Sequence, residues 1–227
     1  MFTGDEQERE ILTPTVAAAA FRAVWIDDRA KLANMIASVT GMRNGEIVAL
    51  RFQDIGPDCL YVSRSYNSED KTKPTKNNKS RTVELPFPEL TQGLVKLAKQ
   101  NPWGVSPDSF VFWSTTRSKA PMQGRTLGVE LRKALIQIGF TAENADKITF
   151  HGWRHFYTSY MIGKLDKKLL KSQTGHLTDI MLNRYSDHEI DGDRKTIQEK
   201  SKETFAGLLP QKVLLLEYKG YDKKTVA

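Results

Sequence analysis

The sequence predicts a mainly α-helical protein with one small antiparallel β-sheet inserted early in the chain, which is an α+β class. Two stretches, one before Leu50 and one after Gln123, repeat their apolar residues at the spacing of a helix. Between them lie short strand candidates, and in one of these, residues 81–85, apolar and polar residues alternate as they do in half-buried strands. A polar, basic turn that contains a proline joins two of these segments, so we expect them to pair.

Two helices and a short third one are expected before the sheet. The first begins at Thr13-Pro14, because threonine is a common N-cap and proline is favoured at the first helical position. The apolar face of the second helix consists of Leu32, Met35, Ile36 and Val39. Gly41 is a suitable C-cap for it. In the short helix that follows, Arg43 and Glu46 are three residues apart and therefore share a face.

The strand candidates lie in the middle of the chain and further helices follow them. Residues 60–65 and 81–85 are the two predicted strands, the basic turn covers 71–79, and residues 109–113 are a third candidate. Further helices are expected at about 124–139, 152–163, 166–172 and 178–188. The C-terminal part is charged up to about Thr204 and then apolar. Its apolar residues either pack on their own domain or form a helix that docks on a neighbouring subunit.

Composition and charge limit the class of protein. The 227 residues suffice for one large domain or two small ones with a sizeable core. Lys and Arg outnumber Asp and Glu by 34 to 27, and the resulting net charge of +7 suits nucleic acid without establishing it as the partner. The single cysteine, Cys59, cannot form an intrachain disulfide and is expected in a strand or the core. The acidic start is unlike a signal peptide, and no apolar run approaches the roughly 20 residues of a membrane span, so we expect a cytoplasmic protein.

Six polar residues follow one another in an order that suits metal-free cleavage of a phosphodiester. They are Arg43, a lysine near residue 76, His151, Arg154, His176 and Tyr185. Arginine donates two hydrogen bonds to a phosphate and stays charged, so two arginines from distant segments can clamp one phosphate. Both are expected near helix starts, which also favour an anion.

The remaining members of the six suit the attack and the proton transfers. Tyr185 can form a covalent phosphotyrosine, but a phenol titrates near pH ~10 and needs help to lose its proton. The arginines would favour the phenolate, and His151 could accept the proton. A lysine could protonate the leaving oxygen, and His176 could hydrogen-bond a phosphate oxygen. The histidines have no carboxylate or cysteine partners at a spacing typical of zinc, so a metal site is disfavoured.

Four segments resemble those of the tyrosine recombinases, also called the phage-integrase family. They are Thr40-Gly41-Met42-Arg43 with Glu46, His151-Gly-Trp-Arg154-His155, Gly175-His176 with Tyr185 nine residues after the histidine, and Thr75-Lys76 before Lys79-Ser-Arg81-Thr-Val83. The resemblance covers about Leu12 to Asp187. It implies a catalytic domain over residues 12–188, between an N-terminal tail (1–11) and a C-terminal helical extension (189–227).

The resemblance also implies a reaction. Such enzymes cut DNA through a 3′-phosphotyrosyl intermediate, usually as a tetramer on two duplexes, without a metal or nucleotide cofactor. By this resemblance Lys76, with Lys79 as the alternative, protonates the leaving oxygen, and Glu46 orients Arg43. Two departures stand out. The family usually has a helical core-binding domain before the catalytic domain, and its absence from this sequence bears on how the DNA site is recognised and held. The second departure is Thr174, which replaces the usual leucine before Gly175-His176.

Other interpretations remain open at the level of sequence. Taken singly, Arg43 could be a surface arginine paired with Glu46, His151 a helix cap, and His155 a core histidine with satisfied hydrogen bonds. Trp153, Tyr157 and Tyr160 are expected in the core, which makes the tyrosines weak rivals as nucleophile. A different class of function is a non-catalytic DNA-binding accessory module of the same fold, and a type IB topoisomerase is a nearer variant. Whether Tyr185 acts in its own subunit or a neighbour's is open.

Overall fold

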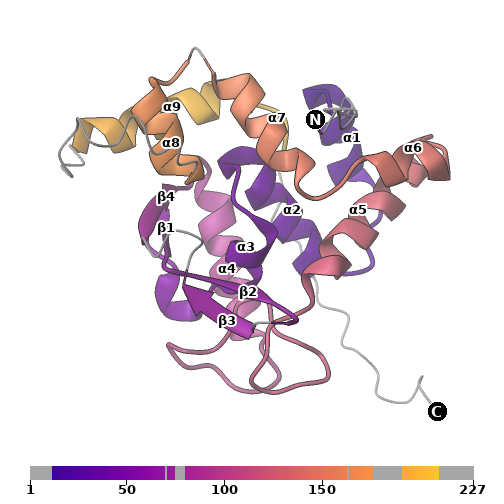
Figure 1. The fold of residues 1–227 in the computed structure, drawn as a ribbon, viewed down its shortest axis with the longest axis vertical. Coiled ribbons are helices and arrows are strands. Elements are labelled where there is room, and N and C mark those ends of the chain that lie inside the picture. The colour runs from indigo at the N-terminus through magenta and orange to yellow at the C-terminus, as the bar shows by residue number, and fades with distance from the viewer. Residues whose placement is uncertain (1–11, 70, 75–79, 163, 176–190, 210–227) are drawn as a thin grey trace, which may run out of the picture.

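Helix α2, Asp28–Thr40, runs through the middle of the molecule, and the other elements pack around it (Figure 1). Nearly all of its side chains are buried, so it forms the centre of the hydrophobic core. The computed structural model describes residues 12–69, 71–74, 80–162, 164–175 and 191–209. Within these ranges the fold is mainly helical with a small amount of antiparallel β-structure, as predicted.

The remaining described helices surround α2. They are α1 (Pro14–Arg22), α3 (Asn44–Val48), α4 (Pro88–Lys99), α5 (Gly124–Gln137), α6 (Ala142–Lys147), α7 (Gly152–Met161), α8 (Lys167–Thr174) and α9 (Asp191–Thr204), with a 3-10 turn at Phe52–Asp54. Two expected termini are confirmed. Thr13 caps α1 by accepting from the Val16 N–H at 3.3 Å, and Gly41 ends α2 in a left-handed conformation with φ of +67°.

Two of these helices were not expected. Helix α4 buries Leu90, Leu94 and Leu97, which recur at helical spacing. This signal was present in the sequence and the prediction missed it. Helix α6 has only six residues, which is too short for a periodic pattern to be recognised. The predicted helix at 178–188 lies outside the described residues.

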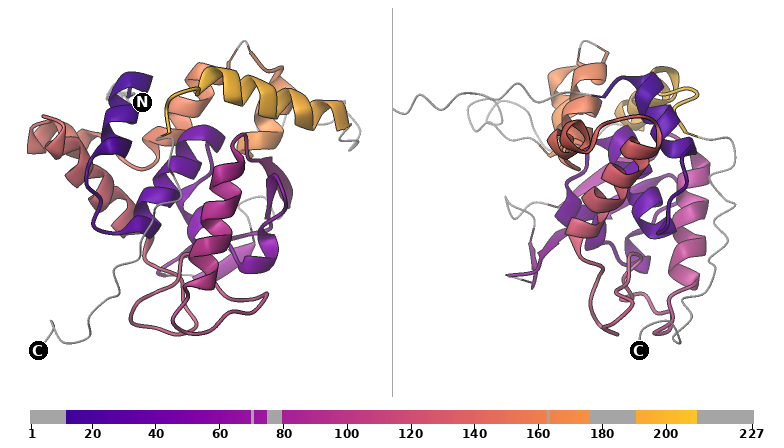
Figure 2. Two further views of the ribbon diagram at one scale, coloured as in Figure 1. Left: turned by 180° about the vertical axis from the view of Figure 1, so that it is seen from behind. Right: turned by 90° about the vertical axis from the view of Figure 1, so that its right-hand side faces the viewer.

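The sheet region differs from the prediction. Strand β1 (Cys59–Val62) pairs antiparallel with β4 (Arg81–Glu84), and β2 (Arg64–Asn67) pairs antiparallel with β3 (Lys71–Pro74). The predicted strand 60–65 therefore divides at Ser63 into two strands with different partners. The expected single sheet is wrong, because there are two sheets of two strands in the described chain. The β2–β3 hairpin projects from the body, and the side chains of β3 are exposed (Figure 2).

The third strand candidate is also wrong. Residues 109–113 make only isolated bridges, from Phe110 to Arg51 and from Trp113 to Pro121. Their apolar character reflects burial of Val111, Phe112 and Trp113 in the core rather than membership of a sheet. Cys59 is buried on β1, as expected. The described residues contain no helix that is long and apolar enough to cross a membrane.

Helix α9 packs back onto its own chain. Phe205, just after it, stacks on Phe156 and Tyr157 of α7 with ring centroids 5.7 and 5.6 Å apart. The interpretation that Phe205 and Leu208 pack on their own domain is therefore confirmed, while residues 213–216 lie outside the described chain. At the other end of α9, the Nε of Arg194 donates to Glu84 of β4 at 2.9 Å.

Candidate functional site

Arg43 stands at the N-cap position of α3, directly after the turn that ends α2. Its backbone N–H donates to Oε2 of Glu46 at 3.0 Å, and its Nη1 donates to Oε1 of the same carboxylate at 3.1 Å. Glu46 thus holds Arg43 at both its backbone and its guanidinium. The Nη2 of Arg43 donates to the carbonyl oxygen of Gly175 at 3.2 Å. Its side chain keeps 28% of its surface exposed, so a ligand can still reach it.

A second arginine binds the same carboxylate. Arg81, at the start of β4, donates from Nη1 and Nη2 to the two oxygens of Glu46 at 2.9 and 2.7 Å. Only 2% of Glu46 is exposed. Burial by itself would raise the pKa of Glu46, but the hydrogen bonds and charges of Arg81 and Arg43 outweigh it and lower that pKa. Glu46 is therefore ionised at neutral pH and neutralises part of the arginine charge.

Arg154 lies on the first turn of α7 and is almost fully buried. Its Nη1 donates to the carbonyl oxygens of Gly41 and Thr174. Burial, followed by the positive charges of Arg43 and Arg81, lowers the pKa of Arg154 to about 9, against an opposing effect of Glu46. Arg154 remains protonated at neutral pH, but in surroundings that favour the arrival of an anion.

The C-terminal end of α8 connects the three arginines. Three successive carbonyl oxygens, of residues 173, 174 and 175, accept hydrogen bonds from Arg81, Arg154 and Arg43 respectively. Helix C-termini carry partial negative charge on such carbonyls, which suits cationic partners. Gly175 makes the approach possible: its φ is +69°, and a Cβ there would lie 2.9 Å from Cζ of Arg81. We call Arg43, Arg81, Arg154 and Glu46 the arginine cluster.

Helix α8 is also fixed to β4. The side-chain amide of Gln173 donates to the carbonyl oxygen of Glu84 at 2.8 Å, and its oxygen accepts from the Glu84 N–H at 2.9 Å. Gln173 is completely buried. Because β4 also begins with Arg81, this pair sets the distance between the arginine cluster and the end of α8.

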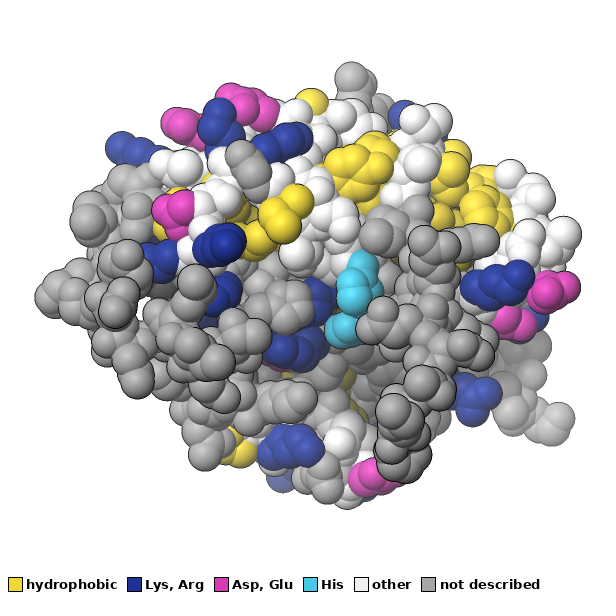
Figure 3. All heavy atoms as spheres, turned by 45° about the horizontal axis from the view of Figure 1, so that its top comes forward, with side chains coloured by type: hydrophobic (Ala, Val, Ile, Leu, Met, Phe, Trp, Pro, Cys, Tyr) yellow, Lys and Arg dark blue, Asp and Glu magenta, His cyan; other side chains and the backbone are white. Residues whose placement is uncertain are grey.

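The two described histidines lie at the start of α7. His151 occupies the N-cap position with helical backbone angles, and its side chain makes no capping hydrogen bond, so its interpretation as a helix cap is wrong. It is exposed and meets the edge of the His155 ring, with ring centroids 5.1 Å apart. The buried Nε2 of His155 has no hydrogen-bond partner in the described chain, so the expectation of a satisfied core histidine is also wrong. Figure 3 shows histidine side chains beside Lys and Arg side chains on this face.

The structure therefore brings together three of the predicted site residues: Arg43, Glu46 and Arg154. His151 is three positions before Arg154 on the same helix start. The other predicted members, Lys76 with its alternative Lys79, His176 and Tyr185, lie outside the described residues. No three His, Cys, Asp or Glu side chains converge as possible metal ligands in the parts of the chain that the structure describes.

Arg81 is the member of the cluster that the sequence-based set omits. A signal existed, since Arg81 belongs to the segment that resembles the family's strand after the lysine. Its partner Glu46 is 35 positions away, however, and no local pattern links the two. The rival tyrosines are accounted for in the core. Tyr157 is fully buried, with its hydroxyl 3.3 Å from that of Ser201, and the partly buried Tyr160 packs on Phe156.

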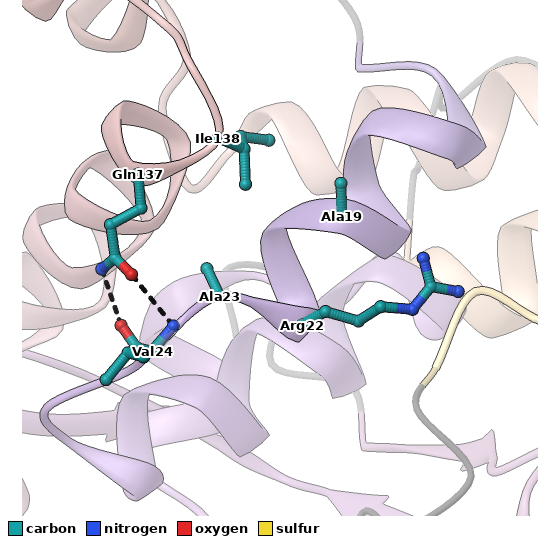
Figure 4. A pocket seen from close by; sticks show the side chains of 6 residues that line it. All are labelled: Ala19, Arg22, Ala23, Val24, Gln137 and Ile138. Carbon is teal, nitrogen blue, oxygen red and sulfur yellow. Dashed lines mark hydrogen bonds between the residues drawn. The ribbon is translucent and has the colours of Figure 1, made fainter.

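A hollow elsewhere on the molecule contains none of these residues. It has a volume of about 360 Å³, and it is lined by Ala19, Arg22, Ala23, Val24, Gln137 and Ile138 (Figure 4). The amide of Gln137 binds both the N–H and the carbonyl of Val24, at 3.0 and 2.8 Å. This hollow lies between α1 and α5 and takes no part in the arginine cluster.

The fold is that of a tyrosine recombinase catalytic domain. The sequence profile of the phage integrase family matches residues 12–190, so the chain belongs to the phage integrase family. A search among curated proteins found no significant match.

Solved structures agree on the fold. The Tn1549 transposon integrase, in complex with a circular intermediate DNA, superposes with a TM-score of 0.63 at 18% identity and covers 88% of this chain and 68% of its own. The lambda integrase catalytic core gives 0.51 at 18% identity, covering 74% of this chain and 96% of its own. XerA recombinase superposes with a TM-score of 0.56 at 19% identity, and the match covers 84% of this chain and 64% of XerA.

Proposed function

We propose that this chain is a site-specific DNA recombinase that cleaves and rejoins strands through a 3′-phosphotyrosyl intermediate, without a metal or nucleotide. The observation that carries the proposal is the arginine cluster. Arg43 and Arg154 come from distant segments and both bind carbonyls at the end of α8, immediately before His176 in the sequence. We also propose residues 12–188 as the catalytic domain.

The charge of the arginine cluster fits this chemistry. Three arginines and one carboxylate have a net charge of about +2, by their ordinary ionisation states. A phosphodiester has one negative charge, and its pentavalent transition state develops a second on the non-bridging oxygens. Fixed cations in a partly buried site stabilise that developing charge more than they stabilise the ground state. A bound phosphate would also offset the burial, and then the repulsion by Arg43 and Arg81, that lower the pKa of Arg154.

In this proposal each residue has one role. The Tyr185 oxygen attacks phosphorus and displaces the 5′ oxygen, which takes a proton from Lys76 or, alternatively, Lys79. His151 accepts the tyrosine proton, and His176 donates a hydrogen bond to a phosphate oxygen. Glu46 orients Arg43. Attack by a 5′ hydroxyl on the phosphotyrosine then reverses the reaction, so the bond energy is conserved and no cofactor is consumed.

Double-stranded DNA is the proposed partner. The net charge of +7 suits it, and the exposed β2–β3 hairpin adds Lys71 and Lys73 to the surface. The structures of the Tn1549 integrase and of lambda integrase bound to a COC′ core site are complexes with DNA. We further propose that the chain acts as a homo-oligomer, a tetramer on two duplexes.

A suicide substrate tests this function. A nicked duplex, drawn from a library of candidate attachment sequences, loses its short cleaved fragment and so traps the covalent protein–DNA adduct. We expect an adduct in EDTA on a denaturing gel for the wild type, and for the control variant Tyr160→Phe, but none for Tyr185→Phe. An adduct that survives Tyr185→Phe would contradict the assignment of the nucleophile.

Two other results would redirect the function. Salt-sensitive DNA binding with no adduct on any substrate would indicate the accessory module instead. Relaxation of supercoiled DNA regardless of its sequence would indicate a topoisomerase.

A further inference from the structure

We propose that Arg81 is a positioning residue for the phosphate clamp formed by Arg43 and Arg154. Arg81 binds the Glu46 carboxylate, so that Arg43 stays available to the scissile phosphate. This inference rests on the proposed function. In the described chain, the hydrogen bonds of the Arg81 side chain go to Glu46 and to the carbonyl of Gln173 at the end of α8. Arg81 therefore acts on the phosphate through Glu46 and Arg43.

The two arginines share Glu46 unequally. Arg81 takes both carboxylate oxygens in a fork, at 2.9 and 2.7 Å, whereas the Arg43 side chain has a single bond of 3.1 Å. The side chain of Arg81 is 12% exposed and that of Arg43 is 28% exposed. The more buried arginine therefore binds the carboxylate more completely, and the more exposed one keeps donors for a ligand.

Removing Arg81 would change this division. Glu46 is buried and ionised, so it would take the remaining nearby cation as its full partner. An arginine and a carboxylate prefer the fork geometry, which would draw the Arg43 guanidinium onto Glu46 and cancel its charge. Arg154 alone would then face the phosphate, and the net charge of the cluster would fall from about +2 to about +1.

The position of Arg81 is set independently of any ligand. Val83, two residues later on β4, is fully buried and fixes the strand, while Nε of Arg81 donates to the Gln173 carbonyl oxygen at 3.4 Å. Gly175 packs directly on the guanidinium. These contacts let Arg81 hold Glu46 in place before DNA binds, which is what a pre-organised clamp requires.

A double-mutant cycle tests the inference. The variants are Arg81→Gln, Glu46→Gln and the two together, and the measurement is the single-turnover rate of adduct formation on saturating suicide substrate. We expect Arg81→Gln to slow cleavage about 10- to 100-fold, the loss of one transition-state contact of ordinary strength. In the double variant no carboxylate remains to capture Arg43, so it should cleave faster than Arg81→Gln and within about threefold of Glu46→Gln.

Arg29→Gln is the matched control. Arg29 is also a buried arginine, 10% exposed and bound to a carboxylate, Asp27, at 2.6 Å, but it lies outside the arginine cluster. Arg29→Gln should lower the melting temperature by about as much as Arg81→Gln does. It should leave the cleavage rate unchanged at temperatures where the protein is folded. A merely structural role of Arg81 would make the two variants alike in both measurements.

The outcomes separate this inference from the proposed function. A wild type that forms no Tyr185-dependent adduct contradicts the proposed function itself. Adduct formation at the wild-type rate in Arg81→Gln would overturn the positioning role and leave the proposed function intact. The same holds if the rate reductions of the two single variants multiply in the double variant. If Arg81→Gln does not fold, comparison of Glu46→Gln with the double variant tests the same coupling, and a further drop of tenfold in the double variant overturns it.

Discussion

Substitution of Gly175 by alanine should reduce both stability and cleavage, and a second glycine provides its control. Gly175 has φ of +69°, where a side chain costs about 1–2 kcal/mol. Its new Cβ would also lie 2.9 Å from both Cζ and Nη1 of Arg81, whose fork on Glu46 leaves it little room to move. Displacing that charged pair should cost on the order of 1–3 kcal/mol more. The expected total loss is thus about 2–5 kcal/mol.

The control is Gly207→Ala. Gly207 has a closely similar φ of +74°, but a Cβ there would meet nothing within 4 Å. It should lose only the backbone cost, about 1–2 kcal/mol. Urea unfolding measures the free energy of unfolding of both variants, and the suicide substrate measures cleavage.

The difference between the two glycines isolates the contact with Arg81. We expect Gly175→Ala to be the less stable variant by at least about 1 kcal/mol. It should also cleave roughly tenfold more slowly, since each 1.4 kcal/mol of transition-state stabilisation is worth tenfold in rate. Equal stabilities together with an unchanged cleavage rate in Gly175→Ala would refute the reasoning that packing at the end of α8 sets the geometry of the arginine cluster.

Three further predictions follow from the same structure. The pKa of Glu46 lies below its ordinary value of 4.5, so the stability that its ionised form contributes is present above pH 4.5 and is lost as pH falls through the lowered pKa. In unfolding experiments at decreasing pH, Glu46→Gln should therefore lose less of its free energy of unfolding than the wild type. An equal dependence of that free energy on pH in the two proteins would contradict the prediction. Phe205→Ala should cost about 3–5 kcal/mol in urea unfolding, because Phe205 is buried against Phe156 and Tyr157, and a loss below about 1 kcal/mol would mean that α9 does not dock as described. Sulfate should raise the melting temperature more than chloride of equal ionic strength, because a bound anion relieves the repulsion between Arg154 and the neighbouring arginines. Arg154→Gln should remove most of that rise, whereas the control variant Arg29→Gln should keep it.

Local chemistry explains where the sequence predicted structure correctly. The caps at Thr13 and Gly41 follow from a hydroxyl acceptor and from freedom at positive φ, which are properties of single residues. The helical faces follow from periodic burial in the same way. The order and spacing of Arg43, Glu46 and Arg154 indicated the cluster because a family resemblance carries long-range information that single residues do not.

The strands show where local patterns fail. Residues 60–65 are predicted as one strand, yet they divide because β1 and β2 pair with different segments. Residues 109–113 are as apolar as a strand, but in the described part of the chain they form only isolated bridges with their neighbours. Strand pairing is a property of two segments, so the composition of one segment cannot decide it.

The sequence by itself determined the mainly helical class, most helix positions, the family and the order of the site residues. Only the tertiary structure decided that Arg81 takes the carboxylate of Glu46, that a buried ring nitrogen of His155 has no partner among the described residues, and that α9 returns to α7. The physical reason is the same in each case. The energy of a charge pair or a packed ring depends on distance and burial between segments that are far apart in the chain, and these are fixed only when the whole core closes.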